Sequence, residues 1–206
     1  MEFYRIDKSF FTQATITVAQ QLLGMLLIRK IDNTTLIGKI VETESYTYGD
    51  PAAHCFSKLT PRNQALFGPV GHAYIYQIYG IHYGFNVVAH NKADKAGGIL
   101  IRAVEPLEGV AVMERNRGGV PFHQLTNGPG KVTQAFQIDR NLYGYDLIWG
   151  DQLFIGRPKT HEPITIISTP RIGITKAQDE KKRFIIKNNP WVTNHSYNAK
   201  INLDTE

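Results

Sequence analysis

The stretch "TTLIGKIVETESY" (residues 34–46) has the apolar, β-branched character of a strand, yet it carries two acidic residues near its end. Glutamate is disfavoured in strands and is rarely buried, so Glu42 and Glu44 are unusual in this position. Because side chains alternate between the two faces of a strand, Glu42, Glu44 and Tyr46 project from the same face. We therefore expect this face to present two carboxylates beside a tyrosine, either as a solvated surface or as part of a site.

Segments rich in β-branched and aromatic residues, bounded by Gly, Asn and Asp, predict further strands around this one. They lie at residues 24–31, 72–79, 83–90, 97–106, 152–156, 163–174 and 182–188. Helical spacing of apolar residues predicts a helix from about Thr15 to about Gly24, a short one over 107–117 and another over 130–138. Strands and helices do not alternate regularly. We therefore predict an α+β domain on a largely antiparallel sheet rather than a doubly wound nucleotide-binding fold.

Composition narrows the class of protein. The 206 residues, 42% hydrophobic and 20% charged, are expected to form a single domain over residues 1–206. The net charge of +5 is compatible with a nucleic-acid partner but does not by itself indicate one. Cys55 is the only cysteine, which excludes an internal disulfide and a cysteine-based zinc site. The apolar run at 22–28 is too short to span a membrane, and residues 1–11 lack a secretory pattern. We expect a cytoplasmic protein with no membrane partner.

Aromatic residues gather near the two carboxylates. Six of the ten tyrosines fall between residues 46 and 83, which predicts an aromatic-lined site. Such a site suits a nucleobase, because aromatic faces stack on it and a carboxylate can activate water for attack at the sugar. Two other functions fit the same residues. One is a binder of nucleic acid that uses tyrosines as stacking platforms, and the other is a hydrolase or transferase acting on free nucleosides.

Two further motifs are weaker. "NGPGKV" at 127–132 resembles a phosphate loop, but Leu125 replaces the upstream glycine and Val132 replaces the residue that would reach magnesium. Lys131 of this segment can still contact a DNA phosphate. His72, His82 and His90 lack the spacing of metal ligands, so no metal is expected.

Several separated blocks of the sequence resemble the alkyladenine (3-methyladenine) DNA glycosylase family, the monofunctional purine glycosylases of the mammalian type. The blocks are "GKIVETESY" (38–46), "AAH" (52–54), "TPRN" (60–63), "YIYQIYGIHYGFN" (74–86), "LIRAVEPLEG" (100–109), "NGPGK" (127–131) and "PWV" (190–192). The strong match covers residues 38–132, and a looser one reaches the C-terminus. The resemblance implies a single domain with a curved, largely antiparallel sheet flanked by helices, no helix-hairpin-helix motif and no cofactor.

The resemblance also assigns roles within a base-binding pocket. It implies that Glu44 is the general base that deprotonates the attacking water, whereas spacing alone leaves Glu42 and Glu44 equally suited. Tyr46 would stack on one face of the flipped base, and His54 would meet the opposite face or edge. Tyr76 would close the pocket, and Asn86 would obstruct the 2-amino group of guanine. Without the resemblance, His54 would be read as a packed core histidine.

Other residues would contact the DNA. The resemblance implies that Tyr79 is the wedge that enters the duplex where the nucleotide has left, and that Arg102 supports the phosphate of the flipped nucleotide. Tyr74 and Tyr83 are interpreted as core aromatics. The sequence departs from the family pattern in two places. His82 occupies a position that is usually aromatic, at the rim of the wedge, and the connection at 46–54 is shorter than in some members, which bears on pocket width and lesion range.

The implied activity is hydrolytic excision of alkylated purines from double-stranded DNA by a monomer, as in base excision repair. The substrates would be 3-methyladenine, 7-methylpurines and, with a protonated leaving base, hypoxanthine. In a bacterium the enzyme would associate with the nucleoid. A lyase would need a lysine amine in the pocket, but Lys39 faces the opposite side of the strand from Glu44. We therefore expect water as the nucleophile and an abasic site as the product.

Overall fold

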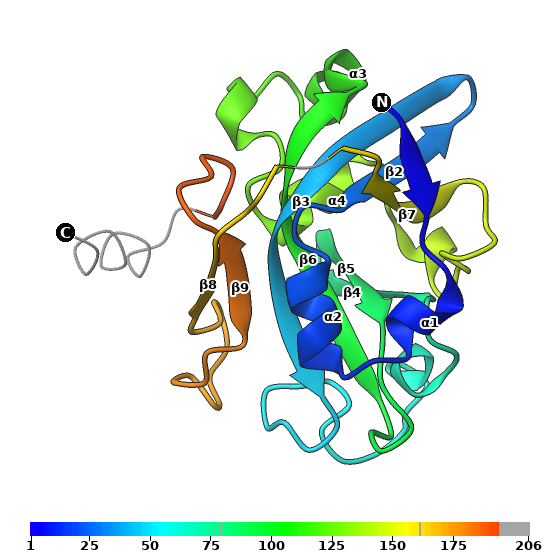
Figure 1. Ribbon diagram of the computed structural model, residues 1–206, viewed down its shortest axis with the longest axis vertical. Coiled ribbons are helices and arrows are strands. Elements are labelled where there is room, and N and C mark those ends of the chain that lie inside the picture. The colour runs from blue at the N-terminus through cyan, green and yellow to red at the C-terminus, as the bar shows by residue number, and fades with distance from the viewer. Residues whose placement is uncertain (79, 161, 194–206) are drawn as a thin grey trace.

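The computed structural model describes residues 1–78, 80–160 and 162–193, which form an open antiparallel sheet of nine strands with four short α-helices (Figure 1). The strands are β1 (Phe3–Arg5), β2 (Leu26–Ile31), β3 (Thr34–Thr47), β4 (Ala73–Ile78), β5 (His82–Val88), β6 (Gly97–Glu108), β7 (Leu153–Pro158), β8 (Ile166–Thr169) and β9 (Arg183–Ile186). The helices are α1 (Lys8–Phe11), α2 (Thr15–Gln21), α3 (Val110–Asn116) and α4 (Pro129–Ala135), with 3-10 turns η1 (Gln64–Phe67), η2 (Phe122–Gln124) and η3 (Arg140–Leu142). The predicted α+β fold on a largely antiparallel sheet is confirmed.

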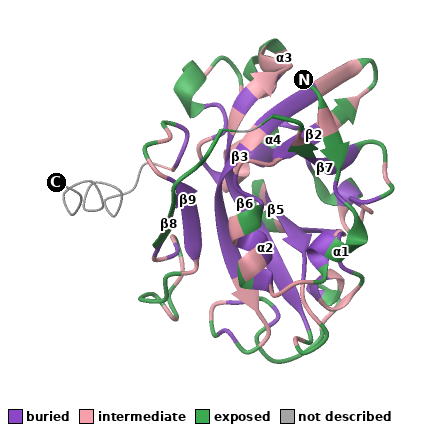
Figure 2. Ribbon diagram, in the orientation of Figure 1, coloured by how far each residue is buried: buried purple, intermediate pink, exposed green. Residues whose placement is uncertain are grey.

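Strand β3 lies at the centre of the sheet, whose order is β1-β7-β2-β3-β6-β5-β4. Its first part pairs with β2, and its acidic end pairs with β9 instead, Glu42–Glu44 lying opposite Ile185–Arg183. Register shifts on both sides of Glu42 interrupt the pairing with β6, and such irregularities bend a strand. The acidic end of β3 therefore has a strand on each side and lies inside the protein (Figure 2).

Helix α2 covers the face of β3 that points away from the carboxylates. Its residues Thr15, Val18 and Ala19 are buried, and Gly24 (φ +82°) adopts the left-handed conformation just beyond the helix end. The Thr43 hydroxyl donates a 2.7 Å hydrogen bond to the carbonyl of Ala19. Since Thr43 faces α2, its neighbours in the strand face the other side, as the alternation of the sequence predicts.

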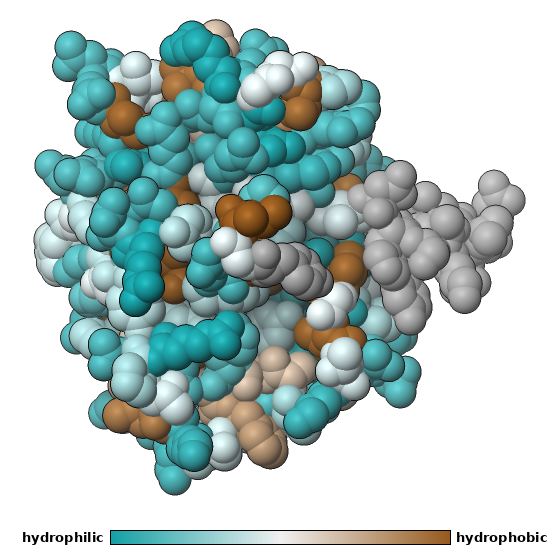
Figure 3. Space-filling view, turned by 180° about the vertical axis from the view of Figure 1, so that it is seen from behind, coloured by the Kyte–Doolittle hydropathy of each residue, from teal (hydrophilic) through white to brown (hydrophobic). Residues whose placement is uncertain are grey.

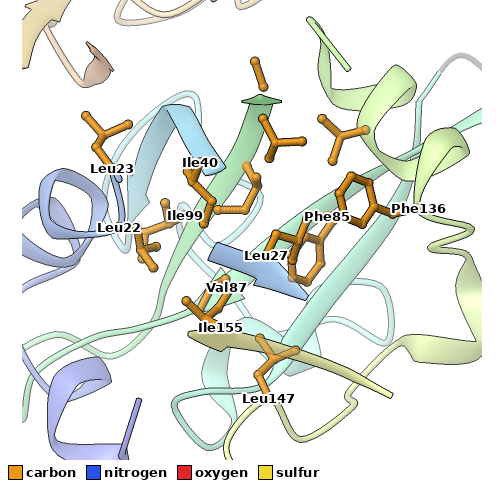
Figure 4. Packing of buried hydrophobic residues seen from close by; sticks show 14 of the residues in the cluster. Leu22, Leu23, Leu27, Ile40, Phe85, Val87, Ile99, Phe136, Leu147 and Ile155 are labelled. Atoms are coloured by element: carbon orange, nitrogen blue, oxygen red, sulfur yellow. The ribbon is translucent and has the colours of Figure 1, made fainter. Parts of the chain in front are cut away.

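The main hydrophobic core lies between α2 and the sheet (Figure 4). Figure 4 shows side chains from the turn just after α2, from the sheet and from later segments packed together: Leu22, Leu23, Leu27, Ile40, Phe85, Val87, Ile99, Phe136, Leu147 and Ile155. A separate cluster around Tyr74, Leu66 and Ala53 lies at the end of the sheet near the acidic part of β3. This second cluster supports the site described below.

Most predicted elements are present, with one correction. The strand predicted over 163–174 ends at Thr169, and the chain then leaves the sheet before it re-enters at β9. Hydrophobic residues on the rear face lie in small separate patches among hydrophilic ones (Figure 3). None of the helices in the described part of the chain is long and apolar enough to cross a membrane.

Candidate active site

A cavity of about 640 Å³ opens at the end of the sheet where β3 carries its two glutamates. Its walls come from strands β3 to β6, from the loop after β3 and from the segment that follows β8. The lining residues are Tyr46, Pro51, Ala52, Ala53, His54, Leu66, Tyr74, Tyr76, Ile78, Asn86, Gly98, Leu100, Arg102, Pro129 and residues 172–176. A volume of this size is typical of sites that hold a small organic group.

Glu44 lies beneath the cavity, fully buried, and three residues that line the cavity hold it there. The Tyr46 hydroxyl donates to its Oε2 at 2.8 Å, and Arg102 donates to the same oxygen at 3.2 Å. The backbone amide of Ile172 donates to Oε1 at 2.8 Å. A carboxylate has about four acceptor positions, so these three donors leave about one acceptor position for a further ligand.

Glu42 is also fully buried but is bound mainly on the side away from the cavity. Its Oε1 accepts from Arg102 at 3.0 Å and from Arg183 at 2.6 Å, and its Oε2 accepts from the Thr193 amide at 2.7 Å. Burial alone would raise the pKa of Glu42, but the charges of Arg102 and Arg183 outweigh burial and lower the pKa. Of its three partners only Arg102 lines the cavity. The structure thus separates two glutamates that spacing could not distinguish.

Tyr46 forms one wall of the cavity. Burial first, and then the adjacent charge of Glu44, raise the pKa of its hydroxyl well above the ordinary value of 10.0, so the hydroxyl stays protonated and donates. The guanidinium of Arg171 lies 4.7 Å from the centroid of the Tyr46 ring. Arg171 is fully buried and does not line the cavity, so it supports the ring from the side away from the cavity.

His54, Tyr74 and Tyr76 form the aromatic part of the cavity wall. The His54 ring contacts Tyr76 edge-on at a centroid distance of 4.6 Å, and its Nδ1 lies 2.8 Å from the Tyr74 hydroxyl. Part of the ring is buried in this contact. That burial, together with the charge of Arg62, lowers the pKa of His54 below 6.5. His54 thus lines the cavity instead of packing in the core, while Tyr74 is buried and holds His54 through its hydroxyl.

Four predicted site residues remain, and two of them line the cavity. Asn86 is buried, lines the cavity and donates to the Tyr74 carbonyl at 3.3 Å. Arg102 lines the cavity with its guanidinium bound to both glutamates, which raise its pKa despite burial. Lys131 donates to Asn127 at 2.7 Å next to the cavity-lining Pro129, and Tyr79 lies outside the described residues.

Sequence reasoning missed the segment at 171–176. Residues 171–174 were predicted as the end of a strand, but the segment supplies the Ile172 amide to Glu44 and places Lys176 on the cavity wall. Pro170, the charged residue at 171 and Gly173 were the signals against a buried strand. Within the described residues, no group of three His, Cys, Asp or Glu side chains is arranged to hold a metal ion.

An aromatic cavity above a buried carboxylate is typical of enzymes that take up a flat ring and act on it with an acid–base group. The sequence profile of the methylpurine-DNA glycosylase (MPG) family matches residues 9–190. The chain belongs to the methylpurine-DNA glycosylase family, and the resemblance noted in the sequence is confirmed.

Individual relatives agree with the family match. The chain is 43% identical over 190 residues to a protein of Carboxydothermus hydrogenoformans, covering 91% of this chain and 98% of that protein. It is 43% identical over 191 residues to a protein of Methanoculleus marisnigri, with the same coverage. It is 44% identical over 183 residues to a protein of Francisella tularensis, covering 87% of this chain and 93% of that protein. Each is named as a proposed 3-methyladenine DNA glycosylase.

Proposed function

We propose that this protein excises alkylated purines from double-stranded DNA by hydrolysis, acting as a monomer and leaving an abasic site. The observation that carries the proposal is the buried carboxylate of Glu44 beneath a cavity with aromatic walls. The family match and the names of the relatives support DNA as the substrate. The chain would act as a single glycosylase domain wherever the DNA lies, in the cytoplasm or the nucleoid of a bacterium.

The damaged base would leave the duplex and enter the cavity between Tyr46 on one side and His54 with Tyr76 on the other. Purines alkylated at N3 or N7 are cationic, and a cation gains about 0.5–2 kcal/mol against the face of an aromatic ring. Damaged pairs are also easier to open, which adds selectivity before the base reaches the cavity. Asn86 lines the cavity, where it would disfavour the 2-amino group of normal guanine. 7-Methylguanine carries the same group, but its cationic ring leaves far more readily and would still be excised.

Glu44 would act as the general base. A water bound at its remaining acceptor position can be deprotonated as it attacks the sugar carbon, and the carboxylate stabilises the positive charge that develops on the sugar. Arg102 and the Ile172 amide hold the carboxylate in a fixed orientation, so little reorganisation is needed during the reaction. Cationic bases leave readily, whereas hypoxanthine must be protonated first.

Basic residues near the cavity would hold the DNA backbone. Lys131 and Lys176 are suited to phosphates on either side of the flipped nucleotide. A phosphate contact by Arg102 stays a prediction, since its guanidinium is engaged by Glu42 and Glu44 in the unliganded protein.

The test is to incubate the protein with a duplex that carries one 7-methylguanine or hypoxanthine and then to treat it with mild alkali. Because 7-methylguanine is itself labile to hot alkali, breaks are scored only in excess of those in the same duplex treated without protein. Strand breaks that appear only after alkali support a monofunctional glycosylase. A nucleic-acid binder would give no breaks, and an enzyme for free nucleosides would release bases from nucleosides but not from the duplex. Either of these results would contradict the proposal.

A further inference from the structure

Arg171 and Asp50 form a buried ion pair next to the cavity, outside the residues that line it. Two guanidinium nitrogens of Arg171 meet the two oxygens of Asp50 at 2.6 and 3.0 Å, a bidentate pair. The side chains of both residues are fully buried. Lys182 adds a second cation, 3.1 Å from Asp50. Burial by itself would raise the pKa of Asp50, but the bonds to its partners outweigh burial and lower the pKa. A charged pair in the interior needs a reason, because hydrophobic residues would often be as stable.

The pair connects three parts of the site that are far apart in the sequence. Arg171 immediately precedes Ile172, whose amide binds Glu44, and it supports the Tyr46 ring at 4.7 Å. It also donates to the Ser45 carbonyl at 3.0 Å, in the strand between Glu44 and Tyr46. Asp50 begins the loop that carries Ala52 to His54 along the cavity wall, and it accepts from the Ala52 amide at 3.0 Å.

We propose that Arg171 is a positioning residue that, through its bidentate pair with Asp50, fixes the position of the Tyr46 ring relative to the Glu44 carboxylate. The inference rests on the proposed function. Arg171 touches neither the cavity nor the reacting atoms, so it acts through Tyr46 and through the Ile172 amide. A lysine can keep the charge at this position but cannot make the planar two-point contact with Asp50 while covering the ring.

The test compares Arg171→Lys with wild type in single-turnover excision of 7-methylguanine and in binding to abasic duplex. Displacement of reacting groups by about 1 Å costs roughly a hundredfold in rate, so we expect a loss of about 10- to 100-fold. Affinity for abasic duplex, which has no base to stack on Tyr46, should stay within about twofold. Asp50→Asn removes the same pair from the other side and should behave alike if Arg171→Lys does not fold.

A double-mutant cycle separates positioning from general damage to the fold. In a Tyr46→Leu background there is no ring to position, so Arg171→Lys should lower the rate by a clearly smaller factor than in wild type. The matched control is Arg5→Lys. Arg5 lies 4.0 Å over the Phe154 ring and binds the carbonyls of Ile148 and Gly150, away from the cavity, and its substitution should leave excision unchanged.

Three results would overturn the inference: full activity of Arg171→Lys, an equal loss in both backgrounds, or a loss of abasic-duplex affinity that parallels the loss of rate. These outcomes are distinguishable from failure of the proposed function. If the wild-type protein excises no base from the lesion duplex, the proposed function fails; if wild type excises and the variants match it, only the positioning role fails.

Discussion

At the scale of single residues, Glu42 and Glu44 differ in their partners and not in their burial. Both are fully buried on the same face of β3 and both contact Arg102. Glu42 has Arg183 as a second cation, whereas Glu44 has the neutral donors Tyr46 and Ile172. A carboxylate held between two guanidiniums is suited to stabilising the fold, and one held mainly by neutral donors beside a cavity fits the general-base role that we propose for Glu44.

A pH dependence is expected from His54. Burial and then Arg62 lower its pKa below 6.5, so the ring is neutral at pH 7 and becomes charged only as the pH falls through the lowered value. A protonated ring would repel a cationic base, so KM for a 7-methylguanine duplex should rise on acidification. His54→Gln should lack this rise. The same acidic increase in wild type and His54→Gln would show that another group is responsible.

The sequence pattern predicted the strand face that these residues share, but it could not distinguish the two glutamates. The alternation of a strand placed Glu42, Glu44 and Tyr46 on one face, and the structure agrees. The contacts that distinguish the two glutamates come from Arg183 and Ile172, which lie more than a hundred residues away along the chain. No local pattern reports such contacts, so only the family resemblance could favour Glu44.

At the scale of elements, strands β4 and β5 set the position of Tyr76. Tyr76 pairs directly with Gly84, and a Cβ added to Gly84 would lie 2.7 Å from the Tyr76 ring. Gly84→Ala should therefore push the ring into the cavity and lower the single-turnover rate by about tenfold or more, by the same displacement argument.

The control for Gly84→Ala is Gly156→Ala on β7, where an added Cβ would lie 2.9 Å from Ile28 and Phe3. Overpacking in a strand typically costs about 1–3 kcal/mol, so both variants should lower the urea midpoint. Only Gly84→Ala should slow excision in the folded protein. Similar rates for the two variants would show that the contact between Gly84 and Tyr76 does not shape the site.

The segment at 171–176 bears on the identity of the nucleophile, because Lys176 lines the cavity. If water attacks the sugar, borohydride should trap no protein–DNA adduct and strand breaks should need alkali. Lys176→Ala should then keep the same products. An adduct that forms with wild type and disappears in Lys176→Ala would instead identify a Schiff base and contradict the water mechanism.

The regular strands and helices were predictable from the sequence, whereas the path of the chain at residues 170–176 was not. The strands near 34–46, 72–79, 83–90 and 97–106 and the helix near residue 15 have strong local patterns, and all are present. Residues 163–174 have the same β-branched composition, but Arg171 finds its partners in Asp50 and the Ser45 carbonyl, outside any sheet ladder. Pro170 interrupts the run just after β8, and the contacts of the buried arginine then override the strand propensity of the residues that follow.

At the scale of the whole molecule, buried charges connect strand β9 to the central strand β3. Arg183 of β9 binds Glu42, and Arg102 of β6 binds it from the other side. Burial raises the pKa of Glu42, but the two arginines lower it below its ordinary value of 4.5. A carboxylate whose pKa is lowered by folding stabilises the protein above its unfolded-state pKa, and this stability is lost as the pH falls through the folded-state value.

The urea midpoint of the wild-type protein should therefore fall steeply below about pH 4.5. Glu42→Gln should be less stable at neutral pH by about 3–5 kcal/mol, because Arg183 and Arg102 each lose a buried carboxylate contact, although Arg102 still binds Glu44. Its midpoint should also fall less steeply in acid. An unchanged acid dependence in Glu42→Gln would show that other carboxylates control acid unfolding.

The central claim is that Glu44 performs the chemistry, and single-turnover excision of 7-methylguanine by matched glutamine variants tests it most directly. Glu44→Gln keeps the shape but removes the proton acceptor, so the rate should fall by at least about a hundredfold while binding to abasic duplex persists. Glu42→Gln, assayed at a temperature where it remains folded, should retain a far higher rate than Glu44→Gln. The account would be contradicted by a folded Glu42→Gln without activity together with an active Glu44→Gln.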